Sequence, residues 1–410
     1  MGEGVQMCTA RLVKQLLPTA SALAVASAAF SAGQASASIN INPLGDSITF
    51  GVNDVESEIG GYRFYYEDLA NSNPLFDLDF IGNRSDGTGT DTDHWGSSGS
   101  QAEDDRNLDP DRPGMLRAVH NITNDPTSNL AAFNPANGKL DAMFIHAGTN
   151  SVPGPIESSD SAGSYGLNNA FDSMRNLLLS GTTGVSANVS GAPDFTTINN
   201  AEGVHAQLSK ASVANSQSHV FVAGIIPAFS FGSFHTNGII DVYNGTAEYN
   251  SQVKNLLDTD PTLNDAGSSI TYHYVDMFSI TVDELDTQWL ADEFTGGDVS
   301  ALIALISPEV DAGTDYVDWG LGFTEANFDE GAYDALNDEA SFTGFNEDLI
   351  GVFFNGSEGN EGVHPTNLGY AIMANVWYNA SEPILVPEPS SVLFVLAGAS
   401  LLMVRRRRQA

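Results

Sequence analysis

The sequence predicts an α/β protein, a three-layer sandwich in which helices cover both faces of a five-stranded parallel sheet. Five short apolar runs alternate along the 410-residue chain with segments of helical periodicity, which favours parallel strands joined by crossover helices. The run at 220–226, Val-Phe-Val-Ala-Gly-Ile-Ile, is continuously apolar, as is typical of a central parallel strand. Polar residues follow several of these runs directly, at the rim where open α/β sheets bind ligands.

The elements follow one another in a regular order. Short apolar runs that stop at Gly, Pro, Asp or Asn predict strands at 39–44, 77–82, 140–146, 220–226 and 270–275. Helical patterns predict helices at 62–71, 167–179, 243–257 and 366–378. Pro365 stands just before the last of these, a favoured place for proline at a helix start. A stretch rich in Gly, Asp, Ser and Thr at 83–100 predicts a loop.

These elements are expected to form one domain at 38–381 with two long insertions. The first insertion, at about 151–215, is rich in loop residues. The second, at about 286–355, is acidic and has a short helical pattern near 299–306. It also contains Trp289 and Trp319, and such aromatic content argues against full disorder.

The first 37 residues have the pattern of a secretory signal peptide. Arg11 and Lys14 give a basic start, an alanine-rich apolar stretch follows at 16–30, and Ala-Ser-Ala at 35–37 fits the small-x-small cleavage rule. Cys8, the only cysteine, precedes the apolar stretch. The exported chain would therefore contain no disulfide, and its stability would come from core burial.

The last 25 residues form a second targeting pattern. Val-Pro-Glu-Pro at 386–389 precedes an apolar run at 390–404 and four arginines at 405–408. This arrangement resembles the PEP-CTERM sorting signal of Gram-negative bacteria. The resemblance implies a short transmembrane segment with transient anchoring, recognition by an exosortase-type protease, and release to the cell envelope or extracellular matrix. The alternative is a plain C-terminal anchor.

The formal net charge of −37 excludes one class of partner. The chain has 52 acidic and 15 basic residues, so the phosphates of a nucleic acid would be repelled. The acidic composition also favours solubility, including in salty water where self-repulsion is screened.

Candidate catalytic groups occupy the strand ends in chain order. Ser47 stands on a Gly-Asp-Ser turn after the first strand, Gly99 follows the second, Asn150 follows the third, and His364 precedes the last helix. A serine on such a turn is a nucleophile if a base reaches it, and an ordinary helix cap if none does. Acyl transfer requires a nucleophile, a base, a group that orients the base, and donors for the oxyanion.

At these blocks the chain resembles the SGNH (GDSL-type) serine esterases, which have a flavodoxin-like α/β fold. Four blocks match in order: Gly-Asp-Ser47, Gly99, Gly-Thr-Asn150, and an acid-x-x-His motif ending at His364. The resemblance implies that Ser47 attacks the ester carbonyl while His364 takes its proton and later gives it to the leaving alcohol. It also implies an oxyanion hole made of the Ser47 and Gly99 backbone N–H groups and the Asn150 amide, with no cofactor and no metal.

The chain departs from the family pattern at the acid. The family has Asp three residues before the histidine, where this chain has Glu361. Glutamate can orient the imidazole, but its additional methylene requires a shifted backbone or another rotamer. Glu358 or a backbone carbonyl could take the same role.

The segments between the blocks resemble the acetyl xylan esterase-like carbohydrate esterases. They include Gly-Gly-Tyr62-Arg63 and the His-Pro-Thr-Asn-Leu-Gly-Tyr segment that begins at His364. This resemblance implies acetyl or other small acyl esters as substrates, on polysaccharide. Asp46 and Trp95 are candidate substrate-lining residues. Trp95 either stacks on a sugar ring or packs locally.

Other polar motifs are expected to be structural. His94 and His146 are expected to be structural histidines. His205 ends a second Glu-Gly-Val-His string, without the following proline and helix, so we expect no catalytic role for it. The chain has no zinc-type ligand spacing and no glycine-rich phosphate loop. The acidic segment 86–93 resembles a calcium loop but lacks the spacing of an EF-hand.

Beside an exported esterase for small acyl groups, a structural matrix protein exported by its tail remains open, as do two further functions. The first is a lipase or thioesterase of the same family, which assays with esters of increasing acyl length would separate. The second is a non-catalytic, carbohydrate-binding surface protein on the same fold, whose Ser47 would not react with a fluorophosphonate probe.

Overall fold

The computed structural model describes residues 38–52, 60–82, 84–85, 87, 89–97, 102, 114–124, 140–149, 167–189, 198–211, 217–226, 239–307, 317 and 364–386. By its contacts the chain divides into two units, Met1–Ser38 and Ile39–Ala410. Only the second unit is described below. The expected signal peptide at 1–37 and the sorting segment beyond residue 386 lie outside the described residues. No described helix is long and apolar enough to cross a membrane.

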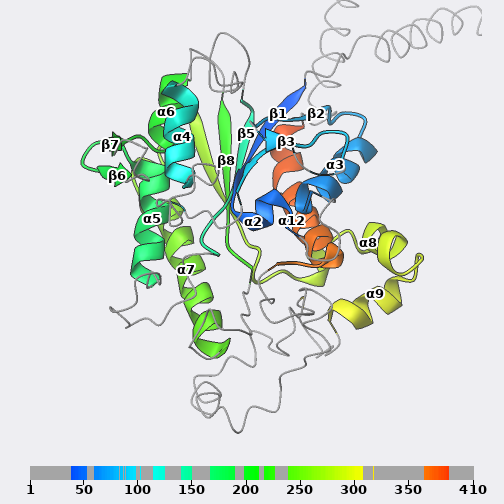
Figure 1. Ribbon diagram of the computed structural model, residues 1–410. Coiled ribbons are helices and arrows are strands. Elements are labelled where there is room, and N and C mark those ends of the chain that lie inside the picture. Colours follow the sequence, from blue (N-terminus) through cyan, green and yellow to red (C-terminus); the bar gives the residue numbers. More distant parts are fainter. Residues whose placement is uncertain are drawn as a thin grey trace, which may run out of the picture. The chain divides into compact units, whose positions relative to one another are not determined.

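A single mixed sheet forms the centre of the second unit (Figure 1). Its seven strands are β1 (Ile39–Gly45), β2 (Leu78–Phe80), β3 (Arg84–Ser85), β4 (Asp93–Gly96), β5 (Ala142–His146), β8 (Ser218–Ala223) and β9 (Ile270–Val275). The order is β3-β4-β1-β5-β8-β9, and β2 also pairs with β1. All pairs are parallel except β3 with β4.

The expectation of five strands was wrong, although all five expected strands are present. The two additional strands, β3 and β4, lie in the stretch 83–100 that we expected to be a loop. β2 and β4 pair with the same side of β1 in succession, β2 alongside Ile39–Ile41 and β4 alongside Leu44 and Gly45. The sequence Asp-His-Trp-Gly of β4 has little apolar alternation, so its strand conformation depends on pairing with β1.

Helices cover both faces of the sheet. One face packs against α3 (Tyr62–Ser72) and α12 (Asn367–Leu385), and α8 (Thr287–Phe294) and α9 (Val299–Ile306) extend the same apolar cluster beyond α12. The other face packs against α4 (Met115–Asn124), α5 (Leu167–Leu179), α6 (Val204–Ala211) and α7 (Ile239–Thr259). Successive residues of the central strands alternate between the two cores. The first apolar cluster lies between the sheet and the helices α3 and α12, and the second lies between the sheet and the helices α4 to α7. In β5, Phe144 belongs to the first cluster and Met143 to the second, as the pleat requires.

The helix α12 is fixed firmly to the sheet and to α3. Trp377 stacks on Phe144 of β5 with ring centroids 4.5 Å apart and an interplanar angle of 3°. The Tyr66 and Ser381 hydroxyls are hydrogen-bonded at 2.8 Å, which joins α3 to α12. Thr366 caps the helix by accepting from the Gly369 N–H. Because α12 is fixed, the two residues before its cap, His364 and Pro365, are held close to the carboxyl edge of the sheet.

Parts of both expected insertions pack on the core. The helix expected near 299–306 is present as α9, and α8 precedes it. The Trp289 indole N–H donates to Asp68 of α3 at 3.0 Å, and the Asp286 N–H donates to Asn375 of α12 at 2.8 Å. In the other insertion, α5 lies at Leu167–Leu179 as expected, while α6 and the two-stranded ribbon of β6 (Ala187–Val189) and β7 (Ile198–Ala201) were not predicted.

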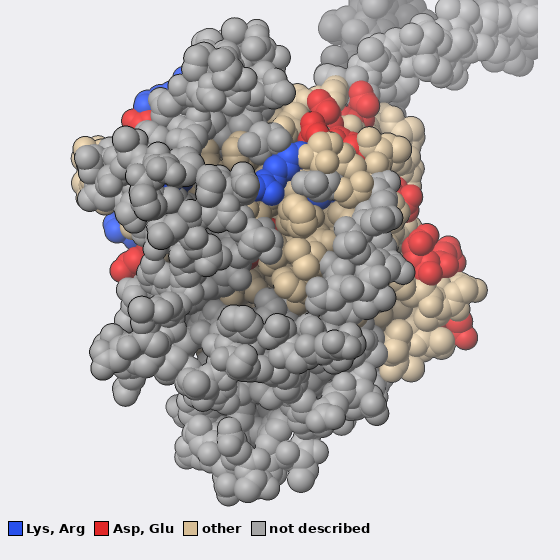
Figure 2. Space-filling view, in the orientation of Figure 1, with Lys and Arg blue, Asp and Glu red and all other residues tan. Residues whose placement is uncertain are grey.

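Acidic side chains are frequent on the described surface. In the view of Figure 2 they lie over the β2–β3 region and along the side of α8. Asp68 on α3, Asp292 and Glu293 on α8, and Asp298 at the cap of α9 are exposed. This distribution agrees with the large negative charge of the sequence.

Candidate active site

A tight turn at the end of β1 presents Ser47. Asp46 is the N-cap of the one-turn helix α2 (Ser47–Phe50), and its side chain accepts from the Ile48 N–H at 3.0 Å. Gly51, with φ of 89°, ends the helix in the left-handed conformation. The turn therefore follows directly from its Gly-Asp-Ser-x-x-x-Gly sequence.

Two glycines let neighbouring backbone approach this turn closely. A Cβ on Gly45 would lie 2.6 Å from the His146 carbonyl oxygen, and a Cβ on Gly96 would lie 2.3 Å from the Phe50 nitrogen. Both contacting atoms belong to the backbone, so neither could move aside as the end of a flexible side chain could. The ends of β1, β4 and β5 are thereby packed tightly around Ser47.

His364 meets Ser47 at this edge. The distance from His364 Nε2 to Ser47 Oγ is 3.0 Å, within the range of a hydrogen bond between a base and a nucleophile. His364 lies two residues before the α12 cap, and its side chain is half-buried. From the first turns of α12, the Tyr370 hydroxyl donates to the Val52 carbonyl at 2.8 Å, just after α2. The base and the nucleophile are thus held by two elements that are themselves bonded together.

The remaining predicted members of the site lie outside the described residues. These are Gly99, Asn150 and Glu361, together with the alternative acid Glu358. The strands that lead to two of them are described. Gly45 at the end of β1 pairs with Gly96 of β4 on one side and with His146 of β5 on the other. The chain segments that lead to Gly99 and to Asn150 therefore leave the sheet on either side of the Ser47 turn.

Arg63 holds the backbone of the Ser47 turn in place, a role that the sequence analysis missed. It is buried, and its guanidinium donates to three backbone carbonyls: Thr49 at 3.0 Å, Thr92 at 2.9 Å and Phe50 at 3.3 Å. Two of these carbonyls belong to α2 and the third precedes β4. The rigid fork of donors suits arginine rather than lysine. The only signal in the sequence was its place in the Gly-Gly-Tyr-Arg segment, to which no function was attached.

Tyr249 of α7 supports the turn after β5 and was also missed. Its hydroxyl donates to the Ala147 carbonyl at 2.8 Å, and its ring fills the space where a Cβ on Gly148 would fall. Gly148 has φ of 126°, a conformation that favours glycine. Burial raises the pKa of Tyr249 above its usual range, so the phenol remains a donor. Through this contact α7 fixes the backbone that leads to Asn150.

Asp46 lies beneath the turn rather than on its surface. We expected it as a candidate substrate-lining residue, but its side chain is fully buried and caps α2. Burial raises the pKa of the Asp46 carboxyl from 3.8 to about 7, and the hydrogen bond from Ile48 partly opposes this shift. Burial also lowers the pKa of the neighbouring His146 from 6.5 to about 4.

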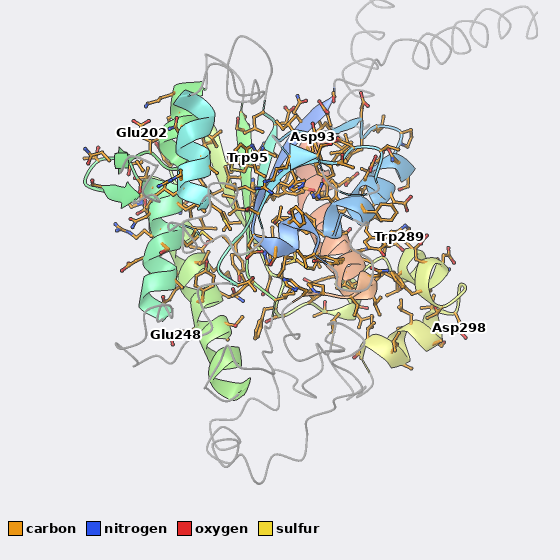
Figure 3. All side chains as sticks on the ribbon, in the orientation of Figure 1. Asp93, Trp95, Glu202, Glu248, Trp289 and Asp298 are labelled. Atoms are coloured by element: carbon orange, nitrogen blue, oxygen red, sulfur yellow. The ribbon has the colours of Figure 1, made fainter. Side chains whose placement is uncertain are left out.

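Trp95 is half-buried on β4 and packs against the second apolar cluster, on the α4–α7 side of the sheet (Figure 3). Its neighbour His94 points to the opposite face, where its ring meets Phe50 edge-on at 5.7 Å. The packing role expected for Trp95 is therefore present. The partial exposure of the side chain leaves the sugar-stacking role a prediction.

The other polar motifs have structural partners. His94 Nδ1 accepts from the Gly96 N–H at 2.8 Å, and burial lowers the pKa of this imidazole to about 2. His205 lies on α6, where it is within 3.2 Å of the Tyr272 hydroxyl. Asp91 accepts from the Phe80 and Asp93 backbone N–H groups. Among the described residues, no group of three or more His, Cys, Asp and Glu side chains could hold a metal ion.

Comparison with known proteins gives only distant similarities. No family model matches the sequence, and no curated protein matches it. Among solved structures, the chain is similar to a family 3 carbohydrate esterase from Clostridium thermocellum, with 17% identity over 85% of this chain and 98% of that one and a TM-score of 0.38.

Two further solved structures show similarity of the same order. A family 3 carbohydrate esterase from Talaromyces cellulolyticus has 19% identity over 65% of this chain and 97% of that one, with a TM-score of 0.29. A possible lipase from Chitinophaga pinensis has 10% identity over 85% of this chain and all of that one, with a TM-score of 0.32. At such scores none of these similarities establishes an activity.

Proposed function

We propose that this protein is an exported serine esterase that hydrolyses acetyl or other small acyl esters, with acylated polysaccharide as its substrate. The observation that carries the proposal is the 3.0 Å distance between Ser47 Oγ and His364 Nε2. A hydroxyl on a strand-to-helix turn, within hydrogen-bond distance of an imidazole, is the arrangement that makes serine a nucleophile.

The proposed reaction proceeds through an acyl-enzyme. His364 takes the Ser47 proton while Oγ attacks the ester carbonyl, and the resulting imidazolium gives this proton to the leaving alcohol. Water then attacks the acyl group, His364 takes the water's proton, and Ser47 leaves with its proton restored. The negative oxygen of each tetrahedral intermediate would accept from the Ser47 and Gly99 N–H groups and from the Asn150 amide. Glu361 would orient the imidazole.

The substrate and the destination of the protein are part of the proposal. Small acyl groups on polysaccharide follow from the resemblance of the Gly-Gly-Tyr-Arg and His-Pro segments to carbohydrate esterases. The leader at 1–37 and the tail at 386–410 support export, transient anchoring, and release by an exosortase-type protease to the envelope or extracellular matrix of a Gram-negative bacterium.

A fluorophosphonate probe tests the nucleophile. The full-length protein should be labelled at Ser47, and Ser47→Ala should abolish both labelling and ester hydrolysis. Ser300→Ala is the matched control, because Ser300 is exposed on α9 and away from the turn. Absence of labelling in folded wild-type protein would contradict the esterase and would favour a carbohydrate-binding protein on the same fold.

A series of esters with increasing acyl length tests the substrate class. We expect kcat/KM to be greatest for acetyl esters and to fall as the acyl chain lengthens. A maximum at long chains would replace the acetyl assignment with a lipase or thioesterase. Release of acetate from acetylated xylan, measured beside release from a soluble aryl acetate, tests the polysaccharide.

A further inference from the structure

Two buried ionisable side chains lie directly beneath the proposed nucleophile. Asp46 immediately precedes Ser47, and His146 is the last residue of the neighbouring strand β5. Both side chains have no exposed surface, and His146 Nδ1 lies 3.9 Å from Asp46 Oδ1. The backbones are in register, since Gly45 pairs with His146.

Several polar atoms of this cluster have no hydrogen-bond partner among the described residues. They are Asp46 Oδ2 and both ring nitrogens of His146. The Thr149 hydroxyl makes no bond of normal geometry either, although it lies close enough to the Asp46 carboxyl to lower its pKa slightly. Buried polar atoms in proteins are nearly always hydrogen-bonded, so such a cluster requires an explanation. The atoms belong to the two turns that would carry the catalytic groups. Asp46 is in the Ser47 turn, and Thr149 immediately precedes Asn150.

We propose that Asp46 and His146 are a pair of positioning residues, in which a ring N–H of His146 donates to the Asp46 carboxylate and so couples the Ser47 turn to the turn that leads to Asn150. This inference rests on the proposed esterase function. The Asp46–His146 distance would need to shorten by about 1 Å to reach the length of a charge-assisted hydrogen bond. Rotation of the ring or a small shift of either turn would be enough.

The charge state of the pair follows from its surroundings. The titratable groups that influence Asp46 from the elements packed on it are the phenols of Tyr62 on α3 and Tyr249 on α7. Burial raises the pKa of both phenols above their usual range, so both stay neutral. Burial lowers the pKa of His146, which therefore donates as a neutral imidazole. Ionisation of Asp46 then decides whether the bond is charge-assisted and therefore strong, and the raised pKa of Asp46 places that change close to neutral pH.

A pH profile distinguishes positioning from simple packing. The proposed base His364 must be neutral and Asp46 must be ionised, so two protons have to leave. We expect the acidic limb of log kcat/KM against pH to rise with a slope approaching two. Asp46→Asn can still accept from the Ile48 N–H but cannot ionise, so its slope should be close to one. Equal slopes in the two proteins would overturn the proposal.

Substitutions of His146 test the donor. In the full-length protein, His146→Leu should lower kcat about 100-fold with KM little changed, since a displacement of about 1 Å at a reacting group has this effect. His146→Gln supplies an amide N–H and should recover most of the loss. Combining His146→Leu with Asp46→Asn should cost no more than the more damaging single change, because one removes the donor and the other the charge of the same charge-assisted bond.

A control variant and the labelling of Ser47 distinguish failure of this inference from failure of the proposed esterase function. His273→Leu, on the outer strand β9, should leave kcat and the pH profile unchanged. Circular dichroism and thermal unfolding identify any variant that does not fold. If the His146 variants do not fold, the slope of the acidic limb of log kcat/KM in Asp46→Asn tests the proposal on its own. A folded His146→Leu that labels at Ser47 and turns over like wild type would refute the pair. Absence of Ser47 labelling in wild type would refute the esterase instead.

Discussion

Ser47 Oγ lies 3.0 Å from His364 Nε2, although 317 residues separate the two in the chain. The serine is fixed by the end of β1 and by the cap of α2, while the histidine is fixed by α12. The contact therefore depends on how these elements pack, and changes in the packing should alter catalysis without touching either residue.

Gly96→Ala should displace the Ser47 turn. The new methyl would lie 2.3 Å from the Phe50 nitrogen, which is backbone and cannot swing away. Such overpacking typically costs about 1–3 kcal/mol, so we expect a lower Tm together with a marked fall in kcat. Gly267→Ala, in an exposed turn where the methyl meets only the Asp265 side chain, is the control and should change neither. An active, fully stable Gly96→Ala protein would show that the close approach is not needed.

Tyr249→Phe should weaken catalysis by loosening the turn after β5. The substitution keeps the ring that packs on Gly148 but removes the 2.8 Å bond to the Ala147 carbonyl. Loss of one buried hydrogen bond costs about 1 kcal/mol in stability. Ser218→Ala is the matched control, because it removes another buried bond, of 3.0 Å from the Ser218 hydroxyl to the Leu140 carbonyl, at the amino end of β8 and away from Ser47. Both variants should unfold more easily, but only Tyr249→Phe should lower kcat. Equal activity of the two variants would remove Tyr249 from the support of the site.

The two ionisable groups beneath Ser47 should give opposing pH dependences of stability. Because the pKa of Asp46 is raised from 3.8 to about 7, its contribution to folding is present below about pH 4 and is lost as the pH rises through 7. Because the pKa of His146 is lowered from 6.5 to about 4, its contribution is present above about pH 6.5 and is lost as the pH falls through 4.

Asp46→Asn removes the first of these contributions. Between about pH 5 and pH 8, the free energy of unfolding of wild type should therefore decrease relative to that of Asp46→Asn. Urea titrations of both proteins at fixed ionic strength provide the measurement. A difference that stays constant across this range would mean that the Asp46 carboxyl titrates as it does in the unfolded chain.

Salt should stabilise the protein. With a formal net charge of −37, the folded chain repels itself, and raising the ionic strength shortens the range of this repulsion. We expect Tm to rise as NaCl is increased from about 0.05 M to about 1 M, over which the screening length falls several-fold. Sucrose at matched osmolality is the uncharged control. A Tm that is insensitive to NaCl would show that the exposed acids are too widely spaced to matter.

The sequence predicted the parts of the fold that local patterns determine. Strong apolar runs gave β1, β5, β8 and β9, and the pattern of α9 was recognised at its observed bounds, Val299–Ile306. The strand β4 was missed because its Asp-His-Trp-Gly sequence forms a strand only through pairing with β1. The helix α6 was missed because 151–215 was treated as an insertion, whereas Val204 and Leu208 are buried in the apolar cluster beside α5 and α7.

The candidate site was predicted only where its residues belong to a motif. Ser47 and His364 were identified as partners from their motifs, and the structure brings them together. Arg63 and Tyr249 support the site through backbone carbonyls, and such bonds leave no pattern in a sequence. The burial of Asp46 also leaves no pattern in the sequence, because its neighbours Tyr62 and Tyr249 lie on two separate helices, the second of them about 200 residues away along the chain.

The acid of the proposed triad is tested by substitution of Glu361. If Glu361 orients His364, Glu361→Gln should lower kcat less than His364→Ala does, because the base itself remains. The same change at Glu202, the acid of the other Glu-Gly-Val-His string, is the matched control. Wild-type kcat in Glu361→Gln would move the orienting role to Glu358 or to a backbone carbonyl.

The most direct test compares two histidines that share one local sequence. His364 and His205 each end a Glu-Gly-Val-His string, but only His364 lies beside Ser47. The measurement is kcat for a small acetyl ester with full-length His364→Ala and His205→Ala proteins of equal Tm. The account predicts a loss of about 10⁴-fold or more for His364→Ala and a rate within about twofold of wild type for His205→Ala. A folded His364→Ala protein that hydrolyses the ester at the wild-type rate would contradict it.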